Sequence, residues 1–187
     1  MMEPPAESEA RAAITNAAET RSSTLRGLMQ QHYESLHEIA RRIHAGEAAG
    51  KAPSPTSLVH EAFVRLVDQP RISARGITFF RACFAQECRR ILVDVARRRR
   101  SKKRGGDAIA TIATTGLVAG HAEIDVLHLN DAIESLTRHN PRLGHVADMR
   151  LFGGMTVEEC ADALDLGKRT VVKDWSFAQQ YLQKELR

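Results

Sequence analysis

The sequence predicts an all-α fold made of two small helical domains, and two observations support this. Apolar residues make up 43% of the 187 residues, enough for packed cores, whereas aromatic residues make up only 5%. A core built mainly from Leu, Val, Ile and Ala favours helices over a β-sandwich. Apolar residues also recur at steps of three and four along most of the chain, which is the spacing of an amphipathic helix.

Changes of composition predict where the domains begin and end. Residues 1–21 are rich in Ala, Glu, Pro and Ser, and we expect them to form a flexible tail. Residues 22–100 carry three helical patterns and predict a first domain. Residues 101–125 are mostly small and weakly patterned, so they predict a flexible linker. Residues 126–187 carry the patterns of a second helical domain.

Three helices are expected in the first domain. The first has its apolar stripe over residues 25–43, and the second begins after Pro55, with Thr56 or Ser57 as its N-cap. The third is long, over residues 78–100, and carries one stripe of buried side chains. The members of that stripe are Phe80, Phe84, Cys88, Ile91 and Val95.

Basic residues are concentrated toward the end of the third helix. Between Arg89 and Arg104 the only acidic residue is Asp94. A local positive field of this density attracts polyanions, and contacts to phosphates add affinity without reading sequence. The candidate contacts are Arg89, Arg90, Arg97, Arg98, Arg99 and Arg100. A solvated helix end and a nuclear-localisation-like signal are the alternatives for this run.

The second domain contains the pattern of a helix-turn-helix. Asn140 and Pro141 suit the cap and first position of one helix, and Thr156 with Glu159 suits the capping box of the next. Residues 165–167 then make a tight connection to a last helix. A small residue, Ala161, lies where two helices would cross, and Leu166 in the turn can fill the core.

The last helix is apolar on one side and basic or polar on the other. Val171, Trp175, Ala178 and Leu182 are expected to point inward. The outer face is expected to carry Lys168, Arg169, Thr170 and Lys173, near the helix N-terminus, where recognition helices read the major groove. A hairpin that belongs only to the core, with a solvated basic face, is the alternative.

Nothing in the sequence indicates catalysis, a metal site or a cofactor. Cys83, Cys88 and Cys160 are an odd number without a C-x-x-C pair, so we interpret them as buried apolar residues rather than a disulfide, zinc or redox site. His37 and His60 each precede a glutamate, but the second histidine of the H-E-x-x-H zinc signature is missing. We therefore expect no catalytic residues, no metal, no cofactor and no enzymatic activity.

The chain also shows no pattern of membrane targeting. No apolar run approaches the roughly 20 residues that a membrane span needs. The first residues, MMEPPAESEA, do not resemble a signal peptide. We expect a cytoplasmic protein without a membrane partner.

Three segments together resemble the ECF-like group of the bacterial sigma-seventy family. They are SLVHEAFVRLVDQP, FFRACFAQECRRILVDVARRRRSKKRGG and MRLFGGMTVEECADALDLGKRTVVKDWSFAQQYLQKELR. The resemblance covers residues 22–187 and places sigma region two before sigma region four, with a linker between them. It implies an alternative sigma factor that directs core RNA polymerase to promoters.

The resemblance also implies roles for individual segments. The helix over residues 58–67 would bind the β′ clamp helices through His60, Glu61 and Arg65. Residues 72–80 and the helix after them would recognise and melt the minus-ten element. Region four would read the minus-thirty-five element and meet the β flap. An anti-sigma factor is a further partner to consider, and the sequence identifies none.

Two phenylalanines in the minus-ten segment have different expected roles. Phe80 falls on the buried stripe and is expected in the core. Phe79 is the better candidate for stacking on melted bases, because an aromatic face accepts any base.

The chain departs from the family pattern at the recognition helix. That helix starts with Gly167-Lys168 in place of Ser-Pro, Val172-Lys173 stands in place of a basic pair, and Asp165 occupies the position of the turn glycine.

Two other functions are alternatives to a sigma factor. A stand-alone helix-turn-helix regulator would need no region two, and a nucleic-acid enzyme would need clustered carboxylates or metal ligands beside the basic run.

Overall fold

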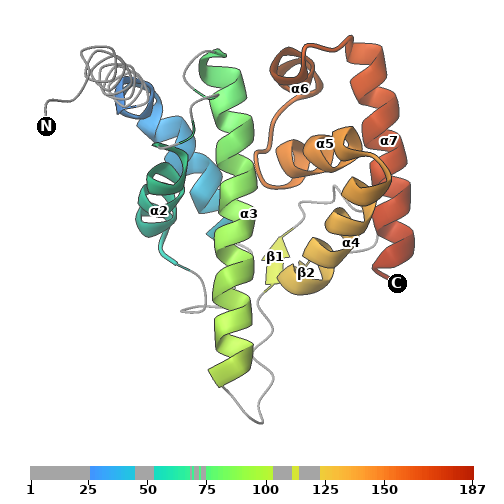
Figure 1. Cartoon of the computed structure of the whole chain (residues 1–187), viewed down its shortest axis with the longest axis horizontal. Helices are drawn as coiled ribbons and strands as arrows, with labels where there is room; N and C mark the ends of the chain where they lie inside the picture. The colour runs from blue at the N-terminus through green and yellow to red at the C-terminus, as the bar shows by residue number, and fades with distance from the viewer. Residues whose placement is uncertain are drawn as a thin grey trace, which may run out of the picture.

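The computed structural model describes residues 26–44, 53–67, 69, 72, 75–102, 111–113 and 123–187, and most of these residues are helical (Figure 1). The all-α prediction is confirmed. After a helix over 26–44 come α2 (Pro55–Val67), α3 (Gly76–Lys102), β1 (Thr111–Ala113), β2 (Glu123–Asp125), α4 (Val126–His139), α5 (Pro141–Leu151), α6 (Val157–Leu164) and α7 (Lys168–Glu185). The predicted tail over residues 1–21 lies outside the described residues.

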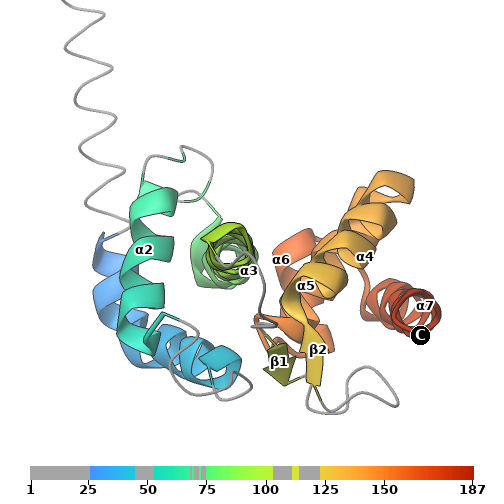
Figure 2. The ribbon, with the colours of Figure 1, turned by 90° about the horizontal axis from the view of Figure 1, so that it is seen from below.

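Helix α3 lies in the middle of the fold (Figures 1 and 2). The helix over 26–44 and α2 lie on one side of it, and we call these two together with α3 the N-terminal helices. On the other side, α3 packs against α4, α5 and α6, which with α7 form the C-terminal helices. The division into two domains joined by a linker stays a prediction, because the two sets of helices pack on each other in this arrangement.

The single buried stripe predicted for α3 was incomplete. Phe80, Phe84, Cys88 and Ile91 are fully buried, whereas Val95 is only partly buried. Further buried side chains lie off this stripe: Ala82, Ala85, Arg89, Leu92, Val93 and Ala96. The difference arises because α3 is covered from two sides, so a pattern that assumes one buried face describes only part of the contact.

The predicted N-cap of α2 was wrong. Ser54 caps this helix, because its Oγ accepts a hydrogen bond from the backbone N–H of Ser57 at 3.2 Å. Thr56 and Ser57 lie inside the helix. Pro55 takes the first helical position, where its missing N–H costs nothing and its fixed φ suits a helix. The cap therefore lies one residue before the proline.

A short β pair lies within the segment that the sequence predicted to be a linker. β1 and β2 are antiparallel, with Ile112 opposite Ile124. Ile124 is buried, and Asp125 caps α4 by accepting a hydrogen bond from the N–H of Leu127 at 2.8 Å. The end of this segment is thus fixed to the C-terminal helices, which the weak apolar pattern did not indicate. Residues 103–110 and 114–122 lie outside the described part of the chain.

The predicted signals at the helix ends of the helix-turn-helix are confirmed. Asn140 caps α5 with Pro141 at its first position, and Thr156 and Glu159 form both hydrogen bonds of a capping box at α6. Helix α6 ends at Asp165, which adopts the left-handed conformation with φ 56° and ψ 50°. This conformation turns the chain sharply into α7 and is the reason that glycine is favoured at such positions.

We expect Asp165→Gly to raise the free energy of unfolding by about 0.5–1 kcal/mol. A left-handed conformation costs an L-residue about 1–2 kcal/mol, and glycine avoids that strain while losing part of the gain to its more flexible unfolded chain. Urea denaturation of the full chain measures the change. The matched control is Asp162→Gly, in the interior of α6, which should lower stability by a few tenths of a kcal/mol. Equal destabilisation by both variants would contradict the conformational argument.

Candidate nucleic-acid interface

The inner face of α7, the predicted recognition helix, is packed into the core. Val171, Trp175, Ala178 and Leu182 are all buried, as predicted. A second anchor was not predicted: Asp174 accepts two hydrogen bonds from Arg142 of α5, at 2.6 Å from Nε and 3.0 Å from Nη2. This bidentate pair fixes α7 against α5. The helix is therefore held rigidly enough to present its outer face in one orientation.

The outer face of α7 carries the predicted base-reading residues. Lys168, Arg169 and Lys173 are exposed, whereas Thr170 is half-buried. The Nζ of Lys168 lies 3.3 Å from Oε1 of Glu158, and both side chains are well exposed, so this ion pair is weak and screened by salt. The pair does not prevent Lys168 from turning toward another anion.

Two exposed apolar side chains on α7 were missed by the sequence analysis. Val172 is 51% exposed and Phe177 is 55% exposed. The available signal was their position, because neither falls on the inner stripe of Val171, Trp175, Ala178 and Leu182. Arg169, Val172, Lys173 and Ser176 are all exposed and are spaced at i, i+3, i+4 and i+7, so they share one face of the helix.

Helix α2 presents a different exposed face. His60 is exposed, and Val64, which was not predicted, is 65% exposed. Arg65 instead ties α2 to α3, because its Nη2 lies 2.8 Å from Oε1 of Glu61 and 2.9 Å from Oδ2 of Asp94. Of the predicted polymerase contacts, His60 is exposed, with its ring centre 6.4 Å from that of Tyr33, while Glu61 and Arg65 form ion pairs within the chain.

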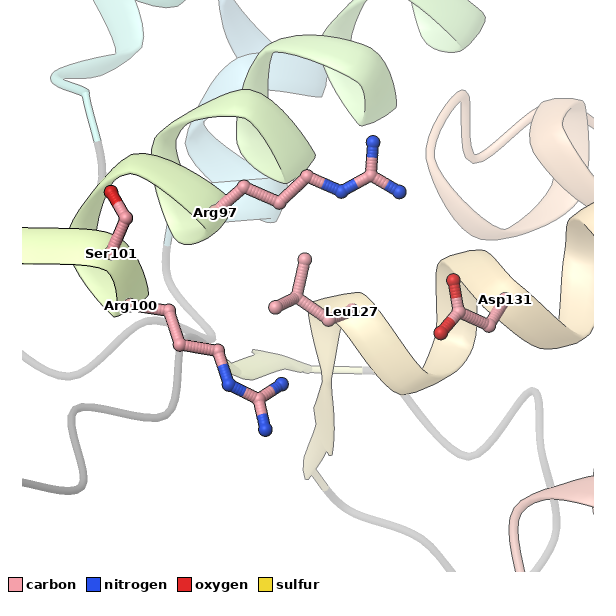
Figure 3. Close-up of a pocket in the computed structure, with 5 residues that line it drawn as sticks. All are labelled: Arg97, Arg100, Ser101, Leu127 and Asp131. Carbon is pink, nitrogen blue, oxygen red and sulfur yellow. The ribbon is translucent and has the colours of Figure 1, made fainter.

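The arginine run lies at the end of α3. Arg97, Arg98 and Arg100 are exposed, and Arg99 is partly buried. Figure 3 shows Arg97 and Arg100 of α3 beside a pocket of about 410 Å³ that Ser101, Leu127 and Asp131 also line. The basic end of α3 therefore lies next to the start of α4, with its guanidinium groups accessible to an anion.

The other predicted DNA contacts on α3 have partners in this arrangement. Arg89 is buried against Asp148 and Asn130, so it does not face solvent. Arg90 is exposed, but its Nη1 lies 2.6 Å from Oε1 of Glu87, with which it forms an ion pair.

The two neighbouring phenylalanines near the start of α3 differ in burial. The guanidinium carbon of Arg75 lies 4.3 Å from the centre of the half-buried Phe79 ring. Phe80 is fully buried, as predicted. The DNA-binding roles assigned to Phe79, Arg89 and Arg90 stay predictions.

The cysteines lie in apolar surroundings. Cys88 and Cys160 are buried, and Cys83 is partly buried. Burial raises the pKa of Cys83 to about 11 and that of Cys160 to about 11. A thiol with such a pKa is almost entirely protonated at neutral pH, so it is a poor nucleophile and a poor metal ligand. This agrees with their interpretation as buried apolar residues.

The described residues also bear on two other kinds of site, metal centres and membrane spans. Among them, no group of three or more His, Cys, Asp or Glu side chains is arranged to hold a metal ion. No helix in the described part of the chain is long and apolar enough to cross a membrane.

A helix-turn-helix with an anchored inner face and a basic outer face defines a class of DNA-binding transcription proteins. The sequence profile of a family described as ECF sigma factor matches residues 12–187. The chain therefore belongs to the ECF sigma factor family, a family of non-enzymatic factors that act in transcription initiation. Among curated proteins and among solved structures, none matches the chain.

We expect Cys83 and Cys160 to react slowly with a thiol reagent in the folded protein at pH 7.5. Because the pKa of each thiol is about 11, the thiolate fraction and the rate should rise about tenfold per pH unit up to that value. Labelling followed by mass spectrometry measures each site separately. The unfolded chain in urea is the control, in which all three cysteines should react quickly. Rapid labelling of the folded protein at pH 7 would contradict this interpretation.

Proposed function

We propose that this protein is an alternative sigma factor that binds core RNA polymerase and directs it to promoters. Membership of the ECF sigma factor family supports the general role. The observation that carries the promoter-reading part is the exposed stripe of Arg169, Val172, Lys173 and Ser176 on a helix whose opposite face is fully packed. A recognition helix needs this combination, because its side chains must reach base edges from a fixed backbone.

In this proposal α7 reads the minus-thirty-five element. Arg169 and Lys173 donate hydrogen bonds to base acceptors, for which guanine O6 and N7 are the preferred partners of basic side chains. Val172 lies between them on the same face and can contact the methyl group of thymine. Sequence preference would then depend on both kinds of contact.

The arginines at the end of α3 have a different role in the proposal. Arg97, Arg98 and Arg100 are all exposed at the end of α3, where Arg97 and Arg100 lie on one side of the helix and Arg98 on another. Such a cluster can hold phosphates along a strand, but it cannot read a base pattern. These residues would therefore increase the affinity for all promoters alike.

The exposed face of α2 is the proposed contact with the β′ clamp helices. His60 and Val64 are four positions apart, which places them on one face of α2, and both are exposed. An interface combines apolar side chains with polar ones around them, so His60 and Val64 can take part in one together. The protein would act where the polymerase is, in the cytoplasm, and would catalyse no reaction of its own.

We expect Val64→Ser to weaken binding to core polymerase about tenfold, because burying a valine at an interface is worth about 1.5 kcal/mol or more. Fluorescence titration of labelled protein with core enzyme measures this affinity. Val172→Ser is the matched control, since it removes an exposed valine from α7 instead. That control should keep core binding and lose discrimination among minus-thirty-five variants. If Val64→Ser bound core polymerase as tightly as the unaltered protein, α2 would not be the contact.

Replacing single arginines on α7 and α3 should separate base contacts from phosphate contacts. Arg169→Ala should cost about 1–3 kcal/mol on the correct promoter and less on promoters altered in the minus-thirty-five element. Arg98→Ala should weaken all promoters alike and reduce the salt dependence by about one counterion. Open-complex formation by the complete polymerase, across several salt concentrations, measures both effects.

The variants in this second experiment also control for each other. Both remove one arginine from an exposed position, so the change in net charge is the same. Neither should unfold the protein, because the inner faces of α3 and α7 are unchanged. A uniform loss with Arg169→Ala together with altered sequence preference for Arg98→Ala would reverse the proposed roles.

A further inference from the structure

The pocket between α3 and α4 is lined by three different kinds of side chain. Its volume is about 410 Å³, and the described residues along it are Arg97, Arg100 and Ser101 of α3 with Leu127 and Asp131 of α4 (Figure 3). Pockets that hold small molecules have volumes of about 300–1,000 Å³. The space beside the basic end of α3 is therefore large enough for a small ligand.

The α3 side of this pocket is cationic. Arg97 and Arg100 are three positions apart, so they lie one helical turn from each other on the same side of α3. Both are exposed, and within the described part of the chain neither guanidinium group has a hydrogen-bond or ion-pair partner. Two neighbouring guanidinium groups of this kind suit phosphate oxygens, because each presents several N–H donors in one plane.

The α4 side combines an apolar surface with a carboxylate. Leu127 and Asp131 are four positions apart and share one face of the helix. Leu127 is half-buried, and Figure 3 shows it between the two arginine side chains, with Asp131 on the next turn of α4. Oδ1 of Asp131 accepts a long hydrogen bond of 3.4 Å from Nδ2 of Asn130. An ionised carboxylate has acceptor sites to spare, so Asp131 can accept further hydrogen bonds from a ligand.

The opposite charges of the pocket leave room for a ligand between them. Among the described residues, Asp131 forms no ion pair with Arg97 or Arg100, although all three line the same space. A simple anion would satisfy the arginines but would be repelled by Asp131. A matching ligand carries an anionic group at one end, hydrogen-bond donors at the other end and a flat apolar body over Leu127. A nucleotide has all three features.

We propose that this pocket binds a free guanine nucleotide, of which guanosine diphosphate is the probe tested below. Arg97 and Arg100 hold the phosphates, the base lies over Leu127, and Asp131 accepts the hydrogen bonds of the base. Guanine presents two neighbouring donors on its Watson–Crick edge, the ring N–H and the exocyclic amino group, whereas adenine presents only its amino group there. A carboxylate only accepts hydrogen bonds, so the pocket favours guanine.

Such a nucleotide would compete with promoter DNA for the end of α3. Arg97 and Arg100 are phosphate contacts in the proposed function, and a bound nucleotide occupies both. The competition rests on the proposed function, whereas binding of the nucleotide to the free chain does not. Guanine nucleotides would therefore lower the sequence-independent part of the affinity for every promoter.

Isothermal titration calorimetry of the full chain, without polymerase or DNA, tests the site. The ligands are guanosine diphosphate, adenosine diphosphate and inorganic pyrophosphate. We expect guanosine diphosphate to bind with one-to-one stoichiometry and about tenfold more tightly than adenosine diphosphate, because one charge-assisted hydrogen bond is lost with adenine. Pyrophosphate should bind more weakly than either nucleotide. Equal affinity for all three ligands, or absence of binding, would overturn the proposal.

A change of base preference tests the role of Asp131. Xanthine has a carbonyl oxygen where guanine has its exocyclic amino group, and the amide of Asp131→Asn can donate to that oxygen. We expect Asp131→Asn to bind guanosine diphosphate about tenfold more weakly and to prefer xanthosine diphosphate. Glu134→Gln is the matched control, since it neutralises another exposed carboxylate of α4 and should keep the preference for guanine. If Asp131→Asn still preferred guanosine diphosphate, the assigned role of Asp131 would be wrong.

A pair of arginine variants tests the phosphate end of the pocket. Arg97→Gln should weaken guanosine and adenosine diphosphate alike, by about tenfold, because both carry the same phosphates. Arg98→Gln removes the same charge from an exposed position on another side of α3, so its effect should be much smaller. Circular dichroism checks that each variant is folded. Equal losses in Arg97→Gln and Arg98→Gln would show a general attraction to the basic helix end and would overturn the site.

Two further measurements separate a free nucleotide from a nucleic-acid strand. If Asp131→Asn weakened binding of a guanine-containing single-stranded oligonucleotide as strongly as it weakened guanosine diphosphate, the pocket would hold a base of a strand and the proposal would be overturned. In open-complex formation by the complete polymerase, guanosine diphosphate should inhibit the unaltered protein more than Asp131→Asn. Equal inhibition of both, with nucleotide binding intact, would reject the competition but not the site. A failure to form open complexes without nucleotide would instead reject the proposed function.

Discussion

The fold depends on covering α3 from both sides. This helix buries Phe80, Phe84 and Ile91 in one direction and Ala85 and Leu92 in another, so neither set of neighbouring helices alone could shield it. Arg89 lies within the contact with the C-terminal helices, and removing a guanidinium group from water requires a partner with matching charge. Asp148 supplies that charge, although burial raises its pKa against the opposing effect of Arg89. The position of the C-terminal helices is therefore set by both apolar packing and one buried ion pair.

The two faces of α7, the last of the C-terminal helices, carry different kinds of side chains. Trp175 and Leu182 hold α7 in the core, and the Arg142–Asp174 pair fixes its direction. The opposite face carries basic and small apolar side chains that have few partners within the described chain. A base-reading surface requires this separation, because residues that stabilise the fold cannot also be free to adapt to DNA. The left-handed Asp165 makes the separation possible by turning α6 sharply into α7.

Sequence patterns predicted the helix-turn-helix well because its signals are local. The capping box at Thr156 and the inner stripe through Val171 each depend on residues within a turn or two of one another. The partner of Arg89 could not be predicted this way, since Asp148 is far away in sequence and a charge in a basic run is normally expected to face solvent. β1 and β2 were missed because strands of three residues carry almost no periodic signal. The resemblance that named the family rested on several separate motifs, and the profile match over residues 12–187 confirms it.

In the proposed function, this protein starts transcription at particular promoters together with core RNA polymerase. Run-off transcription on genomic fragments tests it directly, with core enzyme alone, the protein alone, and both together. We expect discrete transcripts only when both are present, and weak binding of the same fragments by the protein alone. Absence of any new transcript, together with tight and sequence-specific binding of the fragments by the free protein, would reject the sigma-factor role and indicate a stand-alone regulator.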